Sequence, residues 1–231
     1  MARQLIVFDM DGVLVDVTES YRETIVRTVE HFAGVTVTRP QIQDYKNQGG
    51  FNDDWKLSHH IIAQHGVAVE FETLVDYFQG LFHGNGGPGG RPGLGLISRE
   101  RWMARDGLFD RLAARFDFAI FTGRMRWEAE VTLHRFAPSL CFDPIVGMED
   151  VTVLKPAPEG LLKIAASAGD REIWYIGDTV DDARCARAAA VPFIGIASPD
   201  SPRRAELASL FQAEKAVAVL DDINQLESVL V

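Results

Sequence analysis

Two aspartates, Asp9 and Asp11, are separated by a single residue and come directly after the first apolar run of the chain. Within so short a turn their carboxylates would repel each other unless a cation lies between them or one carboxyl group holds a proton. Phosphoryl transfer uses both conditions, because one carboxylate can attack phosphorus while the other donates a proton to the leaving oxygen and later takes one from water. The spacing of Asp9 and Asp11 therefore favours a phosphoryl-transfer site.

Other polar residues suited to the same chemistry stand where predicted strands end or helices begin: Thr122, Gly123, Lys155, Asp178 and Asp182. The Asp178 and Asp182 carboxylates supply the hard oxygen ligands that Mg²⁺ prefers. Thr122, Gly123 and Lys155 supply hydrogen-bond donors and positive charge for phosphoryl oxygens. Taken singly, such residues are equally typical of helix caps, turns and surface loops. The prediction of a site depends on their occurring together.

Short apolar runs rich in β-forming residues predict buried strands. They lie at residues 5–8, 118–121, 173–176, 193–196 and, more weakly, 216–220. Segments with helical periodicity lie between them, at residues 126–136, 158–168, 181–190 and 203–211. Strands that alternate with helices predict an α/β fold with a doubly wound, mostly parallel sheet. Ligands of such sheets bind beyond the carboxyl ends of the strands, which is where Asp9, Thr122 and Asp178 stand.

Residues 17–82 break this alternation, because their apolar positions follow helical spacing without a buried strand. We interpret them as an inserted helical domain. The segment 84–95 that follows is too rich in glycine and proline for regular structure, and it lacks the residue order of a phosphate-binding loop, so we interpret it as a linker. The expected organisation is a core formed by residues 1–16 and 98–231 and a helical cap formed by residues 17–97.

The composition excludes several classes of protein. A formal net charge of -10 over 231 residues argues against a surface for nucleic acid or anionic membranes. The two cysteines, Cys141 and Cys185, have no metal-binding or redox spacing, which predicts a reducing compartment and two buried thiols. The N-terminal apolar run is too short for a signal peptide and no segment has the length of a membrane span. We therefore expect a cytoplasmic protein.

Four motifs together resemble the haloacid dehalogenase superfamily, in the subclass with a helical cap inserted after the first strand, which includes phosphoglycolate phosphatases and β-phosphoglucomutases. They are D-M-D-G-V-L-V-D from Asp9, F-T-G-R from Phe121, K-P-A-P from Lys155 and G-D-T-V-D-D from Gly177. The motifs occur in the family's order and span almost the whole chain.

The resemblance implies a role for each matching residue. Asp9 would be the nucleophile and Asp11 the acid and base. Mg²⁺ would be held by Asp9, the Asp11 carbonyl and Asp178, with Asp182 supporting them. Thr122, Gly123 and Lys155 would bind the transferring phosphoryl group. The acid two residues after the nucleophile points to phosphate esters rather than carbon–halogen substrates.

Substrate specificity is expected in the cap. Segment 46–55 lies between two predicted cap helices, where similar enzymes place a loop that contacts the leaving group, so Lys46, Asn52 and Trp55 are candidates. The alternative is a glycine turn in which Asn52 or Asp53 caps the next helix and Trp55 packs inside the cap. Arg124, and Tyr21 with Arg22 at the start of the cap, are weaker candidates, for which we favour the interpretation as ordinary surface contacts.

The sequence thus predicts a Mg²⁺-dependent phosphatase that hydrolyses a small phosphorylated metabolite through an aspartyl-phosphate on Asp9. One alternative is a phosphomutase that uses the same nucleophile and returns the phosphoryl group to a sugar. Another is a non-catalytic protein that binds a phosphorylated ligand.

Overall fold

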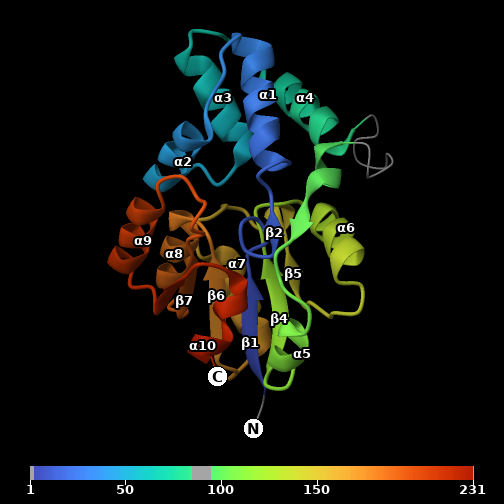
Figure 1. Ribbon diagram of the computed structural model, residues 1–231, viewed down its shortest axis with the longest axis vertical. Helices are drawn as coiled ribbons and strands as arrows, with labels where there is room; N and C mark the ends of the chain where they lie inside the picture. Colours follow the sequence, from blue (N-terminus) through green and yellow to red (C-terminus); the bar gives the residue numbers. More distant parts are fainter. Residues whose placement is uncertain (1–2, 85–94, 231) are drawn as a thin grey trace. The chain divides into compact units, whose positions relative to one another are not determined.

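The computed structural model describes residues 3–84 and 95–230, which belong to two compact units (Figure 1). The core unit consists of Met1–Val15 and Trp102–Val231, and the helical unit consists of Asp16–Arg101. Residues 85–94 of the predicted linker lie outside the described residues.

The core unit is built on a six-stranded sheet in which every pair of neighbouring strands is parallel. The strand order is β5-β4-β1-β6-β7-β8. The strands are β1 (Gln4–Phe8), β4 (Phe116–Phe121), β5 (Ile145–Val146), β6 (Ile173–Gly177), β7 (Phe193–Ile196) and β8 (Ala218–Leu220). The four predicted strong strands are present, and the sheet confirms the predicted doubly wound α/β class.

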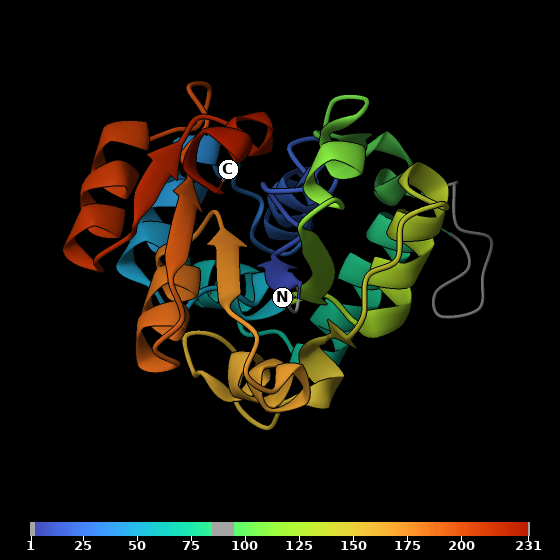
Figure 2. The same cartoon turned by 90° about the horizontal axis from the view of Figure 1, so that it is seen from below.

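Helices cover both faces of this sheet (Figure 2), which explains why its central strands are apolar on both sides. The helices are α5 (Leu108–Leu112), α6 (Arg126–Phe136), α7 (Glu159–Ala168), α8 (Val180–Ala188), α9 (Arg204–Ala213) and α10 (Glu227–Leu230), with short 3-10 turns at Met148–Asp150 and Ile223–Gln225. Aliphatic side chains of α7, α8 and α9 pack on one face with Leu5 and Val7. On the other face Phe8 packs edge to face with Phe109 and Phe142.

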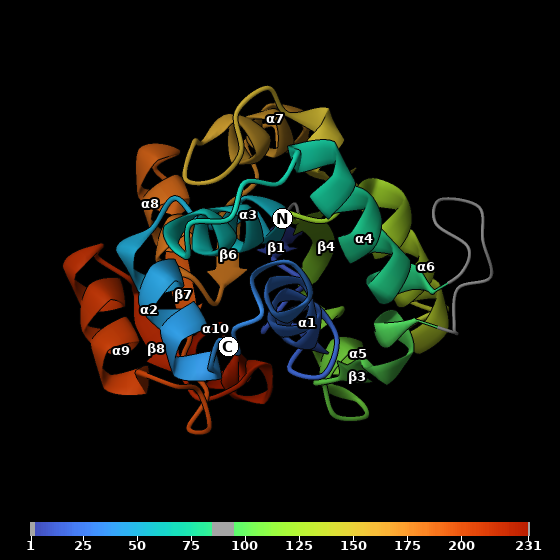
Figure 3. The same cartoon turned by 90° about the horizontal axis from the view of Figure 1, so that it is seen from above.

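The helical unit contains α1 (Tyr21–Ala33), α2 (Arg39–Gln48), α3 (Asp54–Gln64), α4 (Phe71–His83) and a 3-10 turn at Leu96–Arg99. Helix α1 packs against α3 and α4 (Figure 3). Local signals fix where these helices begin and end: Thr38 and Gln41 form a capping box at the start of α2, and Gly34 ends α1 in the left-handed conformation. Two further strands, β2 (Val15–Asp16) and β3 (Arg101–Trp102), form a separate two-stranded sheet.

Two predictions about single elements were incomplete or wrong. The sequence did not reveal β5, because two residues are too few for a recognisable apolar run. Cys141 is exposed rather than buried, since it lies in the loop after α6, whereas Cys185 is buried in α8 as expected. Among the described helices none is long and apolar enough to cross a lipid bilayer.

Candidate active site

The candidate site lies in the core unit, where the central strands β4, β1 and β6 end. Phe8 pairs with Ile120 on one side and with Ile176 on the other, so the carboxyl ends of the three strands lie side by side. The Asp9 backbone N–H donates to the Ile176 carbonyl at 2.8 Å, which continues the ladder as far as the first acidic residue. The chain winds away from β1 in opposite directions on its two sides, and this switch point is where doubly wound sheets bind ligands.

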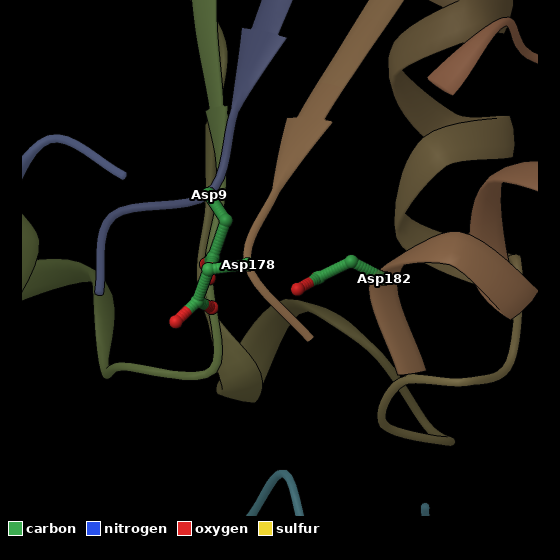
Figure 4. A group of neighbouring side chains, drawn as sticks. All are labelled: Asp9, Asp178 and Asp182. Atoms are coloured by element: carbon green, nitrogen blue, oxygen red, sulfur yellow. The ribbon is translucent and has the colours of Figure 1, made fainter. Parts of the chain in front are cut away.

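Three carboxylates converge at this edge of the sheet: Asp9, Asp178 and Asp182 each bring an oxygen within 4.8 Å of the other two (Figure 4). Asp9 follows β1, Asp178 follows β6, and Asp182 lies in the first turn of α8. Asp9 is 4% exposed and Asp182 is fully buried. Gly12 permits this convergence, because its φ of +73° is in the left-handed region and a Cβ there would overlap the Asp178 carboxylate.

Lys155 joins this acidic cluster from the loop before α7. Its Nζ donates to Asp9 Oδ1 at 3.0 Å, to Asp182 Oδ1 at 2.8 Å and to the Tyr175 hydroxyl at 2.8 Å. These three acceptors match the three N–H bonds of an ammonium group. Burial acts to lower the pKa of Lys155, but the charges of Asp182 and Asp9 outweigh it and the pKa is raised. Lys155 is therefore a permanent positive charge against the Asp9 carboxyl group.

The surroundings stabilise the carboxylate form of Asp9 less than that of Asp182. Burial raises the pKa of Asp9 to about 7 against the opposing charge of Lys155, and the charges of Asp182 and Asp11 add to the increase. Burial acts in the same direction on Asp182, but the charge of Lys155 and hydrogen bonds from Lys155, Thr179 and Tyr175 lower its pKa. The cluster therefore has more negative charge than Lys155 neutralises, which is the environment that a bound cation needs.

Asp182 is held by protein donors at both oxygens. Oδ1 accepts from Lys155 and from the Tyr175 hydroxyl at 2.7 Å, and Oδ2 accepts from the Thr179 amide at 3.0 Å and the Thr179 hydroxyl at 2.6 Å. Thr179 and Asp182 form the capping box of α8, so helix capping fixes the position of this carboxylate. With its oxygens already engaged, Asp182 fits a role beside a metal ion better than a role as ligand. The hard oxygens of Asp9 and Asp178 are the ones that fit a divalent cation.

The remaining phosphate-binding candidates follow β4. The Thr122 amide donates to the Val146 carbonyl at 3.0 Å, which is the contact that β5 provides. The Thr122 hydroxyl oxygen accepts from the Arg124 amide at 3.1 Å, so its own proton is left for another acceptor. Gly123 is half-buried in the turn between them.

Arg124 is not the surface residue that the sequence suggested. Its side chain is 1% exposed. Nε donates to Asp11 Oδ1 at 2.7 Å, and Nη2 forms an ion pair with the same oxygen at 2.5 Å. Nη1 donates to the Thr132 hydroxyl of α6 at 3.0 Å. The signal was present in the F-T-G-R motif, which places Arg124 two residues after Thr122 at the same strand end, but the sequence did not reveal that its partner would be Asp11.

The specificity candidates lie in the helical unit. Lys46, in the last turn of α2, places Nζ 2.6 Å from Asp54 Oδ1, and the two side chains are 8% and 12% exposed. Asp53 caps α3, accepting from the Trp55 and Lys56 amides at 3.0 and 3.1 Å, as one of the sequence alternatives proposed. Asn52 and Trp55 are half-buried. A role for these residues in specificity stays a prediction.

Comparisons with known proteins give relatives in sequence and in fold. The chain is 32% identical over 206 residues to the imidazoleglycerol-phosphate dehydratase of Phytophthora nicotianae, covering 86% of this chain and 44% of that protein, so it spans less than half the length of this relative. The phosphatase Tt82 from Thermococcus thioreducens superposes with a TM-score of 0.64 and 25% identity, covering 91% of this chain and 99% of that one. A predicted phosphoglycolate phosphatase from Haemophilus somnus superposes with a TM-score of 0.74 and 17% identity, covering 99% and 98%.

The sequence model of the haloacid dehalogenase-like hydrolases matches residues 4–190, which include every strand that forms the candidate site. The resemblance drawn from the four motifs is thereby confirmed, and the chain belongs to the haloacid dehalogenase-like hydrolase family.

Proposed function

We propose that this chain is a Mg²⁺-dependent phosphatase that hydrolyses a small phosphorylated metabolite by way of a phosphoryl group carried on Asp9. The observation that carries the proposal is the environment of Asp9: a buried carboxyl group at a strand end, 3.0 Å from the Lys155 ammonium and beside the Asp178 carboxylate. Lys155 keeps one Asp9 oxygen in place, and the other oxygen is then available to attack phosphorus. The family membership and the likeness to phosphatase Tt82 support this choice of chemistry.

The residues proposed to hold Mg²⁺ are the Asp9 and Asp178 carboxylates and the Asp11 carbonyl, with Asp182 fixing Lys155 beside them. The ion, when bound, would neutralise charge on the nucleophile and on the phosphoryl oxygens. The proposed ligands are hard oxygen atoms, which Mg²⁺ prefers, and the cluster has excess negative charge; both support Mg²⁺ at this position. In this proposal residues 1–16 and 98–231 form the catalytic core and residues 17–97 the cap.

The protein groups divide the reaction into two displacements. Asp9 attacks phosphorus, the bond from phosphorus to the leaving oxygen breaks, and Asp11 gives that oxygen a proton. Water then attacks the phosphorus on Asp9, Asp11 takes a proton from the water, and Asp9 is released with inorganic phosphate. The Thr122 hydroxyl, the Gly123 amide and the Lys155 ammonium stabilise charge on the phosphoryl oxygens in both steps.

The test is phosphate release from a panel of small phosphomonoesters, with Mg²⁺ and with EDTA, for the wild type, Asp9→Asn and Asp178→Asn. We expect each variant to lose about 10³-fold or more in turnover, because nucleophile and metal ligand serve the transition state rather than the core. We also expect Mg²⁺ to raise the Tm of the wild type but not that of Asp178→Asn, since ligand binding stabilises only the protein that binds it.

Release that persists in EDTA or in Asp9→Asn would contradict the proposal. Two outcomes would favour the alternatives. Turnover that appears only with added glucose bisphosphate would point to a phosphomutase, and Mg²⁺ binding without any turnover would point to a binding protein.

A further inference from the structure

Arg124 makes an unusual set of contacts for a residue in a strand-end turn. Two of its nitrogens converge on one oxygen, Asp11 Oδ1, while the third donates to Thr132 in α6. A guanidinium group is planar and has its donors in a fixed arrangement, so these contacts define the orientation of the group they bind. The buried Arg124 side chain therefore ties the Asp11 carboxyl group to helix α6.

Asp11 needs such an anchor. It lies in the loop after β1 rather than in a regular element, and the next residue, Gly12, has a left-handed backbone. The Asp11 side chain is 29% exposed, so packing alone does not fix its rotamer. Because both Arg124 contacts with Asp11 go to Oδ1, Asp11 Oδ2 can give a proton to another group or take one from it.

We infer that Arg124 is a positioning residue for Asp11, which it holds by Oδ1 so that Oδ2 faces the oxygen that leaves phosphorus. The inference rests on the proposed function. In the first displacement the proton on Oδ2 passes to the leaving oxygen as its bond to phosphorus breaks, and Asp11 becomes a carboxylate. In the second, Asp11 takes a proton from the attacking water, which restores the acid. Arg124 keeps its protons throughout and touches neither phosphorus nor the leaving group.

Substrates with different leaving groups distinguish this positioning role of Arg124 from a purely structural role. An alkyl phosphate needs a proton on its leaving oxygen, whereas p-nitrophenyl phosphate releases an anion that is stable without one. The ratio kcat/KM includes only the steps up to release of the leaving group, so it is not affected by the later hydrolysis on Asp9. Comparing kcat/KM for the two substrates therefore isolates proton donation by Asp11.

We expect Arg124→Met to lower kcat/KM about 100-fold for the best alkyl phosphate of the panel but less than about 5-fold for p-nitrophenyl phosphate, in keeping with the usual size of general acid catalysis. Asp11→Asn should show the same selectivity, and the double variant should be no worse than Asp11→Asn alone, because both changes remove one function. Thr132→Val removes the α6 hydroxyl that accepts from Arg124 Nη1, and it should lower kcat/KM less, about 3-fold to 10-fold, again for the alkyl substrate only.

Arg126→Met is the matched control. Arg126 begins α6 two residues further on and pairs with Asp150, with its side chain 42% exposed. Arg126→Met should change kcat/KM equally for both substrates or leave it unchanged for both. If Arg124→Met does not fold, Thr132→Val tests the inference by the same comparison of kcat/KM for the alkyl phosphate and for p-nitrophenyl phosphate.

The inference is overturned if Arg124→Met and Thr132→Val lower kcat/KM to the same extent for both substrates, or if neither variant lowers kcat/KM for the alkyl phosphate. It is also overturned if the effects of Arg124→Met and Asp11→Asn on kcat/KM for the alkyl phosphate are additive. A wild type whose turnover does not need Asp9 would overturn the proposed function instead, so the two failures are distinguishable.

Discussion

Each unit of the molecule contains a buried lysine next to carboxylates, and the two lysines are partnered differently. Lys46 in the helical unit meets one carboxylate, Asp54, and forms a balanced pair. Lys155 in the core unit meets Asp9 and Asp182, and Asp178 adds a third carboxylate to the same cluster. The Lys46–Asp54 pair has one positive and one negative charge and needs no further ion. The cluster around Lys155 has more carboxylates than ammonium groups, so it can attract a cation. The excess charge, rather than the burial of a lysine, marks the candidate active site.

The largest effect that tests this comparison is expected from Lys155→Met. Loss of the ammonium leaves Asp182 buried without its ion-pair partner and removes charge from the transferring phosphoryl group. We expect the free energy of unfolding in EDTA to fall by about 3–5 kcal/mol and turnover to fall at least about 10²-fold to 10³-fold. Urea unfolding and phosphate release measure the two effects. An unchanged unfolding midpoint would mean that Lys155 does not hold the cluster together.

Lys46→Met is the counterpart in the helical unit. It removes the ion pair with Asp54 and should lower the free energy of unfolding by about 1–3 kcal/mol, because the Asp54 carboxylate loses its charged partner. Lys46→Met with Asp54→Asn should recover part of that loss, because no carboxylate is then left without its partner. If the variant instead raises KM without changing stability, Lys46 serves the substrate, as the sequence predicted, and the comparison of a structural with a functional lysine fails.

The smallest change is Tyr175→Phe, which removes a hydroxyl that accepts from Lys155 and donates to Asp182. Burial, with the charges of Asp182 and Asp9, raises the pKa of Tyr175 well above its usual range, so the hydroxyl is a stable donor. We expect a loss of about 1–2 kcal/mol in unfolding free energy and a decrease of about 3-fold to 10-fold in kcat with little change in KM. Equal stability of variant and wild type would show that the two charged partners hold each other without the hydroxyl.

The elements that carry the candidate site could be read from the chain because each has a local signal. Leu5, Ile6 and Val7 form an apolar run that only a strand buried on both faces satisfies, and α6 begins and ends at the predicted residues. The alternation of strands and helices fixed the fold class, and the rule that ligands bind at the carboxyl ends of parallel strands directed attention to Asp9, Thr122 and Asp178. The four motifs were specific because they occur together.

The pairings within the site had no local signal. Arg124 is 113 positions from Asp11, and Lys155 is 146 positions from Asp9, so nothing in either segment specifies its partner. Likewise, the sequence offered Asp182 as a carboxylate near a metal, but the three residues that engage its oxygens come from a strand, a loop and a helix cap. Sequence alone determined the elements and the edge of the sheet at which the polar residues gather, because periodicity and turn chemistry are local. Only the tertiary structure decided which charge faces which, because that depends on how β1, β4 and β6 align and on what the loops after them bury.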